Sequence, residues 1–467
     1  IYSVTKQLYP DWILHITNAN MSDPDLAEKL EKFNDKRIKN SSTLTSDPNG
    51  WVLELRPDTQ LHEAALFAAA VSINKNPEVS LLYSDHDHVG PDENFCDPYM
   101  KPDWNPDLFS AMNYLTPFIV FKHELWSIHK NKELDQHLSL VETTKALSHN
   151  EIFHIPHVLA SVRVSGNGTH LEPVCKRVVY DLPDPAPRVS ILIPTHDQGH
   201  ILERCLKSIF EKTDYLNFEI VLIDHETTEI KALNIINEFK DDENFKIINY
   251  SGSFNFSAIM NYAAKFAKGQ ILISLNNDTE IIDSGWLTEL VSQVSRPEVG
   301  VVGALLLFGD GTIQHGGVHP GEGGLMGHGH KHLSGESPGY FNRLKAVHEV
   351  AAVTGACMAI KKSTWFDLGG LDEENLTVAY NDIDLCFKAR EKGLRIIFTP
   401  FAKIIHHESI SRGEDKDPIL NKRLQKELKT MHSRWNKIIE FDPAYSPNLK
   451  LDGGSFKLAE RPRDLLL

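Results

Sequence analysis

The sequence predicts a mixed α/β protein that contains the same kind of domain twice. Short apolar runs, such as Val189–Ile193 and Ile220–Ile223, alternate with segments whose apolar residues recur at helical spacing. This alternation favours a mostly parallel sheet with helices on its faces. The length of 467 residues gives room for two or three domains. The third observation is a repeated pattern of residues.

The repeat relates two halves of the chain. Asp58-Thr59 and Asp278-Thr279 both follow a strand-like run, and Pro77-Glu78-Val79 and Pro297-Glu298-Val299 lie further on. The offset is constant, because 278 − 58 and 297 − 77 both equal 220. A period this long is typical of a duplicated domain rather than a solenoid. We expect domains at residues 1–180 and 188–415, a proline-rich linker at 181–187, and a C-terminal helix and tail at 416–467.

The composition argues against several classes of protein. Lys and Arg number 48 and Asp and Glu 64, so the net charge of 48 − 64 = −16 disfavours a nucleic-acid partner. No apolar run approaches the roughly 20 residues of a membrane helix. The five cysteines are scattered and odd in number, which favours a reducing compartment without a disulfide framework. We expect a cytoplasmic protein without a transmembrane segment, and leave open peripheral association with the inner face of the membrane.

Three short polar elements in the second copy can carry chemistry. Asn276-Asn277-Asp278 follows a buried strand and offers oxygen ligands to a divalent cation. Asp382 stands near the start of a predicted helix, and His406-His407 lies beside Glu408. Taken singly, each has an ordinary structural explanation as a turn, a helix cap or a packed polar cluster.

Together and in this order, the elements resemble those of the family-2 glycosyltransferases with the A-type nucleotide-diphosphosugar fold. The likeness is closest to the bacterial O-antigen and surface-polysaccharide branch, in which rhamnosyltransferases are common. The matching segments are Ile193-Pro194-Thr195, Phe254–Ser257, Leu275–Glu280, Thr354-Gly355-Ala356, Gly369–Glu373, Asn381–Leu385 and His406–Gly413. The first copy shows the likeness through Tyr83-Ser84-Asp85 and Lys101–Trp104. The resemblance implies two tandem A-type domains with Rossmann-like sheets.

The resemblance also implies a mechanism. An inverting enzyme of this family moves a sugar from a nucleotide-diphosphosugar donor to a glycan or lipid-linked glycan acceptor. Asp382 matches the catalytic base, and Asp278 and His406 match the ligands of Mn²⁺ or Mg²⁺. The positions that match donor contacts are Pro194, Thr195, Asp224, Asn255, Asn276, Asn277 and Arg412. Asn276 stands where the family's metal motif has its first acidic residue.

Glycine and histidine dominate residues 314–332. The glycines predict a mobile loop that closes over a ligand. His315 and His328, with Gly355 and Asp372 further on, are therefore candidates for a lid or for acceptor contacts. An ordinary surface loop and a separate transition-metal site are the alternatives. The histidine-rich run Asp85–His88 in the first copy is interpreted as a solvated loop.

The first copy is expected to be truncated and degenerate. Ile1–Val4 resembles the middle of the second copy's first helix, and Arg56-Pro57-Asp58 stands in place of Asn276-Asn277-Asp278. Aligning Pro156 with Pro400 places Val162 at the position of His406, because 406 − 244 = 162. Asp135 is the nearest match to Asp382. The alternatives are a bifunctional enzyme with both copies active, a non-catalytic glycan-binding or scaffold protein, and a nucleotidyltransferase.

Overall fold

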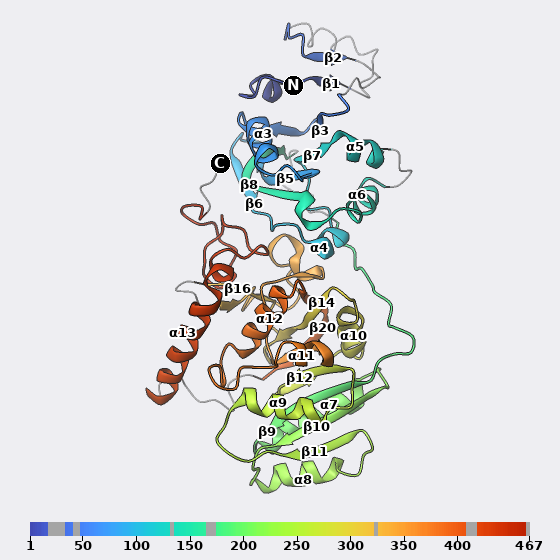
Figure 1. Ribbon diagram of the computed structural model, residues 1–467, viewed down its shortest axis with the longest axis vertical. Coiled ribbons are helices and arrows are strands. Elements are labelled where there is room, and N and C mark those ends of the chain that lie inside the picture. Colours follow the sequence, from blue (N-terminus) through green and yellow to red (C-terminus); the bar gives the residue numbers. More distant parts are fainter. Residues whose placement is uncertain are drawn as a thin grey trace. The chain divides into compact units, whose positions relative to one another are not determined.

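The computed structural model describes residues 1–16, 33–40, 47–130, 135–164, 174–321, 326–407 and 418–463 (Figure 1). The described residues form two compact units. Unit 1 takes in Ile1–Trp104 and Asn113–Pro173, and unit 2 takes in Asn105–Met112 and Val174–Arg463. Unit 2 thus differs from the expected second domain in including a short segment of the first half and the C-terminal residues.

Unit 2 is built on one large mixed sheet. Its strands run in the order β11-β10-β9-β12-β19-β14-β20-β13, with β15 beside β14 and β18 beside β20. Their bounds are β9 Val189–Thr195, β10 Phe218–Asp224, β11 Phe245–Asn249, β12 Ile271–Leu275, β13 Thr279–Ile281, β14 Val299–Leu307, β15 Ile313–His315, β18 His348–Glu349, β19 Cys357–Lys361 and β20 Arg395–His406. The first four strands of this order are parallel, and β19 joins them antiparallel. The predicted α/β fold with a Rossmann-like parallel sheet is confirmed for this unit.

Helices pack on both faces of the unit 2 sheet. The helices of the unit are α4 Pro106–Ala111, α7 Gly199–Lys212, α8 Ile230–Phe239, α9 Phe256–Phe266, α10 Trp286–Val294, α11 Lys362–Asp367, α12 Asn381–Glu391 and α13 Pro418–Glu440, with the 3-10 helix η3 at Tyr340–Lys345. Apolar residues of α7, α8 and α10 form one buried cluster with the sheet, and those of α9, α12 and α13 form a second. Val189, Ile191 and Ile193 of β9 lie in the first cluster and Leu192 lies in the second, so this strand is buried on both faces.

The short helix α4 belongs to unit 2 because of a buried ion cluster. Asp107 accepts hydrogen bonds from Arg296 at 2.9 and 3.0 Å and also pairs with Arg395. Burial alone would raise the pKa of Asp107, but the two guanidinium groups outweigh it and hold this pKa below its usual value. Removing either arginine would leave a buried charge only partly compensated.

Unit 1 repeats part of this strand pairing. Its larger sheet has the order β3-β7-β5-β8-β4 with β6 beside β5, and β1 and β2 form a separate parallel pair. The elements are α1 Tyr2–Thr5, β1 Leu14–Ile16, β2 Ile38–Asn40, β3 Trp51–Leu53, β4 Thr59–Leu61, α3 Ala65–Lys75, β5 Leu81–Val89, β6 Phe95–Tyr99, β7 Ile119–Lys122, α5 His123–Lys130, α6 Gln136–Thr144, η1 His149–Glu151 and β8 Ile152–Arg163. β5 pairs with β7 antiparallel and with β8 parallel, as β14 does with β19 and β20.

The two sheets also agree in register at one informative point. Thr59 faces Val162 in the β4–β8 ladder, and Thr279 faces His406 in the β13–β20 ladder. Val162 and His406 thus occupy matching register positions in the two ladders.

Two segments predicted as loops are strands instead. Asp85–His88 lies within β5, where Asp85 is fully buried and its Oδ1 lies 2.8 Å from His154 Nε2. In the glycine- and histidine-rich stretch, β15 is followed by β16 (Val318–Pro320) and β17 (Met326–His328), which pair antiparallel. Polar residues form these strands because partners from distant parts of the chain cover them.

Candidate active site

Polar residues gather where the parallel strands of unit 2 end. Asp224 is the register partner of Thr195, so the ends of β10 and β9 are level, and Asn276 follows the end of β12. The Asn277 amide Nδ2 donates to Thr195 Oγ1 at 3.1 Å. Pro194 lies one residue inside β9. The sheet therefore brings these predicted donor positions to one edge, the usual ligand edge of such sheets.

Asp278 and His406 meet beside this edge. The β13–β20 pairing places them across one ladder, and the His407 backbone N–H donates to the Asp278 carbonyl at 2.8 Å. His406 Nε2 lies 3.0 Å from Asp278 Oδ1, and the Asn276 Nδ2 amide lies 3.3 Å from the same nitrogen. Both Asp278 and His406 are buried. Residues separated by more than a hundred positions are thus brought together as the sequence predicted.

The donor set suits a divalent cation that brings other ligands with it. Within the described ranges, no group of three or more His, Cys, Asp or Glu side chains is arranged to hold a metal ion. A carboxylate, an imidazole nitrogen and a nearby amide are nevertheless ligand types that Mn²⁺ accepts. Mg²⁺ and its analogues commonly take one or two protein ligands and fill the remaining positions with phosphate oxygens and water. The residues present therefore fit a cation shared with a bound diphosphate.

Asp382 lies in the first turn of α12, as the sequence predicted. Its Oδ2 accepts a hydrogen bond from the Gly355 backbone N–H at 2.7 Å, and its Oδ1 accepts one from Ile383 N at 2.9 Å. Ser274, on β12, donates through its Oγ to the Gly355 carbonyl at 2.7 Å. These bonds hold the carboxylate next to the end of β12, and it keeps lone pairs that can accept a proton.

Some predicted site residues have structural partners. Asn255 caps α9 by accepting from Ala258 N at 3.0 Å. Asp372 accepts from the backbone of Glu374 and Asn375 and pairs with Arg434 at 2.7 Å. Burial would raise the pKa of Asp372. The backbone hydrogen bond from Asn375 and the Arg434 guanidinium outweigh burial and lower this pKa to about 2. Asp224 accepts from Thr227 N at 3.0 Å. Arg412 lies outside the described residues.

The histidines expected on a lid lie in short strands. His315 is fully buried in β15, and its Nδ1 lies 2.7 Å from Nδ1 of His328 in β17. Burial, reinforced by the neighbouring His328 and His406, lowers the pKa of His315 well below its usual value. Gly355 lies in the turn before β19, beside Asp382.

The roles of Gln314 and Glu427 were not predicted from the sequence. Gln314 is buried in β15 against His406, and Glu427 is buried on α13 beneath the segment that leads to Asp382. A signal for Glu427 was present, because it lies in the apolar stripe of α13 between Leu424 and Met431. A carboxylate in such a stripe needs partners. Gln314 had no comparable local signal.

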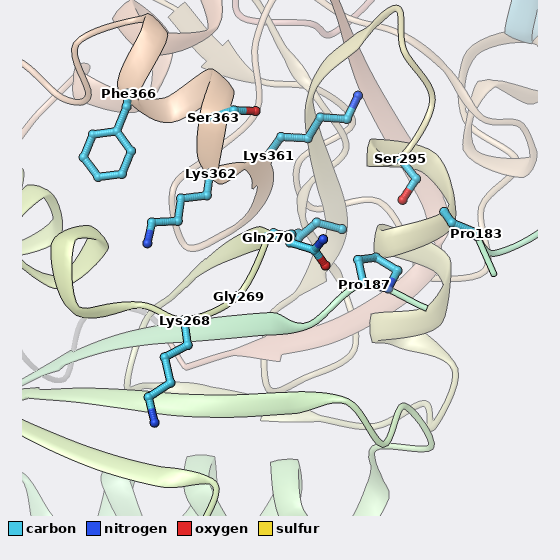
Figure 2. A pocket seen from close by; sticks show the side chains of 11 residues that line it. Pro183, Pro187, Lys268, Gly269, Gln270, Ser295, Lys361, Lys362, Ser363 and Phe366 are labelled. Carbon is cyan, nitrogen blue, oxygen red and sulfur yellow. The ribbon is translucent and has the colours of Figure 1, made fainter. Parts of the chain in front are cut away.

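A hollow lies at the opposite ends of these strands from the candidate site. It has a volume of about 690 Å³ and is lined by Pro183, Pro187, Lys268, Gly269, Gln270, Ile271, Ser295, Lys361, Lys362, Ser363 and Phe366. Figure 2 shows the three lysine side chains pointing apart. The ammonium groups of Lys361 and Lys362 donate to backbone carbonyls at 2.6 Å each. The lysines do not converge on one ligand position.

Comparison with known proteins identifies the class of unit 2. Residues 190–363 match the model of glycosyl transferase family 2. O-antigen biosynthesis protein RfbC of Myxococcus xanthus is 30% identical over 99% of this chain and 40% of its own length. An uncharacterised protein of Sinorhizobium fredii is 32% identical over 98% of this chain and 56% of its own length. Residues 190–363 of unit 2 therefore form a region of the glycosyl transferase family 2 type.

The relatives are longer than this chain, and a solved structure has a similar fold in part. The chain spans about half the length of the curated relatives it matches. A mannosyltransferase from Pyrobaculum calidifontis, solved with GDP-Man and Mn²⁺, is 18% identical and covers 58% of this chain and 71% of its own, with a TM-score of 0.41. Across the described ranges, no helix combines the length and apolar character needed to cross a membrane.

Proposed function

We propose that unit 2 is an inverting glycosyltransferase in the synthesis of a bacterial surface polysaccharide of the O-antigen type. Its donor is a nucleotide-diphosphosugar and its acceptor a glycan or lipid-linked glycan. The observation that carries the proposal is the meeting of Asp278 and His406 beside the carboxyl edge of a parallel sheet, with Asp382 at the same edge. The likeness to the O-antigen protein supports the surface-polysaccharide role.

Asp278 and His406 would hold Mn²⁺ or Mg²⁺, with Asn276 beside them. When bound, such an ion stabilises the negative charge that develops on the diphosphate leaving group. Thr195 and Asn277 hold each other at the strand ends, where a nucleotide can lie across β9 and β12. Pro194, Asp224 and Asn255 shape the surrounding backbone.

Asp382 would act as the base. The acceptor hydroxyl oxygen forms a bond to the anomeric carbon while the bond from that carbon to the diphosphate oxygen breaks. The hydroxyl proton passes to the Asp382 carboxylate, and nucleoside diphosphate leaves. The bond from Gly355 N–H to Oδ2 fixes the carboxylate without occupying all of its lone pairs.

Unit 1 would be a degenerate partner that supports unit 2 or helps to hold the acceptor. Arg56 Nη2 pairs with Asp58 Oδ2 at 2.7 Å, so a cation already stands beside the carboxylate. Val162, the register equivalent of His406, cannot bind a metal. Asp135 caps α6 by accepting from His137 N at 3.0 Å. The same pairing of β5 and β14 with their neighbours supports the tandem arrangement.

The free state of all five cysteines fits the reducing cytoplasm as the place where the protein acts.

Incubation with a panel of nucleotide sugars, followed by product analysis, tests the proposal. Release of nucleoside diphosphate together with a glycosylated acceptor is expected. Release of pyrophosphate would indicate a nucleotidyltransferase, and binding of glycan without turnover would indicate a scaffold. Two product linkages that depend separately on Asp58 and Asp278 would indicate a bifunctional enzyme.

A further inference from the structure

Gln314 makes two hydrogen bonds to the same histidine. Its Oε1 lies 2.6 Å from His406 Nδ1, and its Nε2 donates to the His406 backbone carbonyl at 3.3 Å. Gln314 is buried in β15, while His406 ends β20. The Gln314 side chain on β15 therefore contacts both the ring and the backbone of His406, the candidate metal ligand on β20.

The pair of bonds fixes which way the amide points. A carbonyl oxygen can only accept, so the NH₂ group of Gln314 must face the His406 carbonyl. Its Oε1 then faces Nδ1, which must carry a hydrogen to donate. In a neutral imidazole with hydrogen on Nδ1, the other nitrogen, Nε2, carries the lone pair. The backbone carbonyl thus determines the histidine tautomer through the glutamine.

The lone pair of Nε2 points into the candidate metal site. Nε2 lies 3.3 Å from the Asn276 Nδ2 donor and 3.0 Å from Asp278 Oδ1. An imidazole lone pair and a carboxylate oxygen at this distance repel each other unless a proton or a cation lies between them. A divalent cation can take the place of that proton, and it needs the deprotonated nitrogen as its ligand.

We propose that Gln314 is a positioning residue that holds His406 in the tautomer required to bind the divalent cation through Nε2. This inference rests on the proposed metal site. The neutral amide orients the ring without adding a charge, so the protein ligands of the cation keep a single negative charge from Asp278. Partners of this kind raise metal affinity by about 10- to 100-fold.

Manganese binding tests the role without measuring turnover. Electron paramagnetic resonance counts free Mn²⁺ in titrations with Mn²⁺ alone and with uridine, guanosine and thymidine diphosphate in turn. Gln314→Leu should weaken Mn²⁺ binding by about 10- to 100-fold. Gln314→Glu keeps an acceptor for Nδ1–H and should recover most of the affinity. The control is Gln293→Leu, because Gln293 is also buried and hydrogen-bonded but lies on α10 with Glu289 and Arg296.

The outcomes separate the inference from the proposed function. If Asp278→Ala binds Mn²⁺ as tightly as the parent chain, the proposed metal site is wrong. If binding depends on Asp278 but Gln314→Leu matches the parent, the positioning role is wrong. Should Gln314→Leu fail to fold, ¹⁵N chemical shifts of selectively labelled histidines in the parent chain decide the matter. Hydrogen on Nδ1 of neutral His406 is expected, and hydrogen on Nε2 alone would overturn the proposal.

Discussion

Glu427, on α13, accepts a hydrogen bond from the backbone N–H of Val378 at 3.0 Å. The same carboxylate accepts from Thr377 Oγ1 at 2.9 Å and Ala379 N at 3.3 Å. Tyr380 follows in the left-handed region, with φ of 62°, and α12 begins at the next residue. A helix that lies beyond the expected catalytic domain therefore holds the segment that aims Asp382.

We predict that Glu427→Leu lowers kcat by about 100-fold, because a misplacement of the reacting groups of about 1 Å has an effect of this size. The KM for the donor should change little, since the proposed donor positions lie at the ends of β9, β10 and β12, away from Glu427. Initial rates over a range of donor concentrations measure both constants. Glu440→Leu on the exposed end of the same helix is the control and should behave as the parent. Equal losses in both variants would show a general effect of α13.

Activity should require a divalent cation. Asp278 and His406 supply one negative charge between them, so a cation is needed to offset the charge of the leaving diphosphate. Excess EDTA should abolish sugar transfer, and added Mn²⁺ or Mg²⁺ should restore it. Full turnover after exhaustive chelation would rule out the metal-dependent reaction.

Asp382→Asn should separate binding from chemistry. The amide keeps the size of the side chain and an oxygen for the Gly355 N–H, but it is not a base at neutral pH. The rate should fall by about 10²- to 10⁴-fold, the usual contribution of a general base. Calorimetric titration with the donor should give nearly unchanged affinity. A parallel loss of donor affinity would make Asp382 a binding residue instead.

The stability of unit 2 should fall in mild acid. Burial, assisted by Arg343, lowers the pKa of His330 and of His348 to about 3. The folded state thus holds these rings neutral, whereas the unfolded chain protonates them near pH 6.5. The stabilisation is complete above about pH 6.5 and is lost as the pH falls toward 3, at about 1.4 kcal/mol per pH unit for each histidine.

Urea unfolding at pH 7, 6 and 5 measures this dependence above the range in which most carboxylates titrate. In His348→Phe, the free energy of unfolding should fall less steeply with decreasing pH than in the parent. The difference should be about 1.4 kcal/mol per pH unit, because one fewer histidine takes up a proton on unfolding. An unchanged slope in that variant would show that His348 does not carry the effect.

The sequence predicted three of the four parallel strands of unit 2, β9, β10 and β12, because they are buried on both faces and mostly apolar. Val189–Ile193 became β9, and Asp382 opened α12 as expected. The strand containing Asp85 was missed because its charge is balanced by His154, which is distant in sequence. A local sequence pattern cannot show that a charged residue such as Asp85 will have an ion-pair partner on another strand.

In the candidate site too, residues within recognisable motifs were predicted, and residues whose role depends on contacts distant in sequence were not. Asp278 and His406 were found because family-like motifs surround them. Gln314 and Glu427 were missed because their importance comes from what they touch. Asn255 was expected at the donor and is seen to cap α9, a role that Asn at a helix start often has.

The matched pair Asp58→Ala and Asp278→Ala tests the central claim most directly, with the rate of sugar transfer to the acceptor as the measurement. The claim is that unit 2 carries the one competent site. Arg56 already pairs with Asp58, and Val162 replaces the histidine there. Asp58→Ala should transfer sugar at nearly the parent rate, and Asp278→Ala should lose on the order of 10³-fold or more. Loss of transfer or of one product linkage in Asp58→Ala, or full activity in Asp278→Ala, would contradict the account.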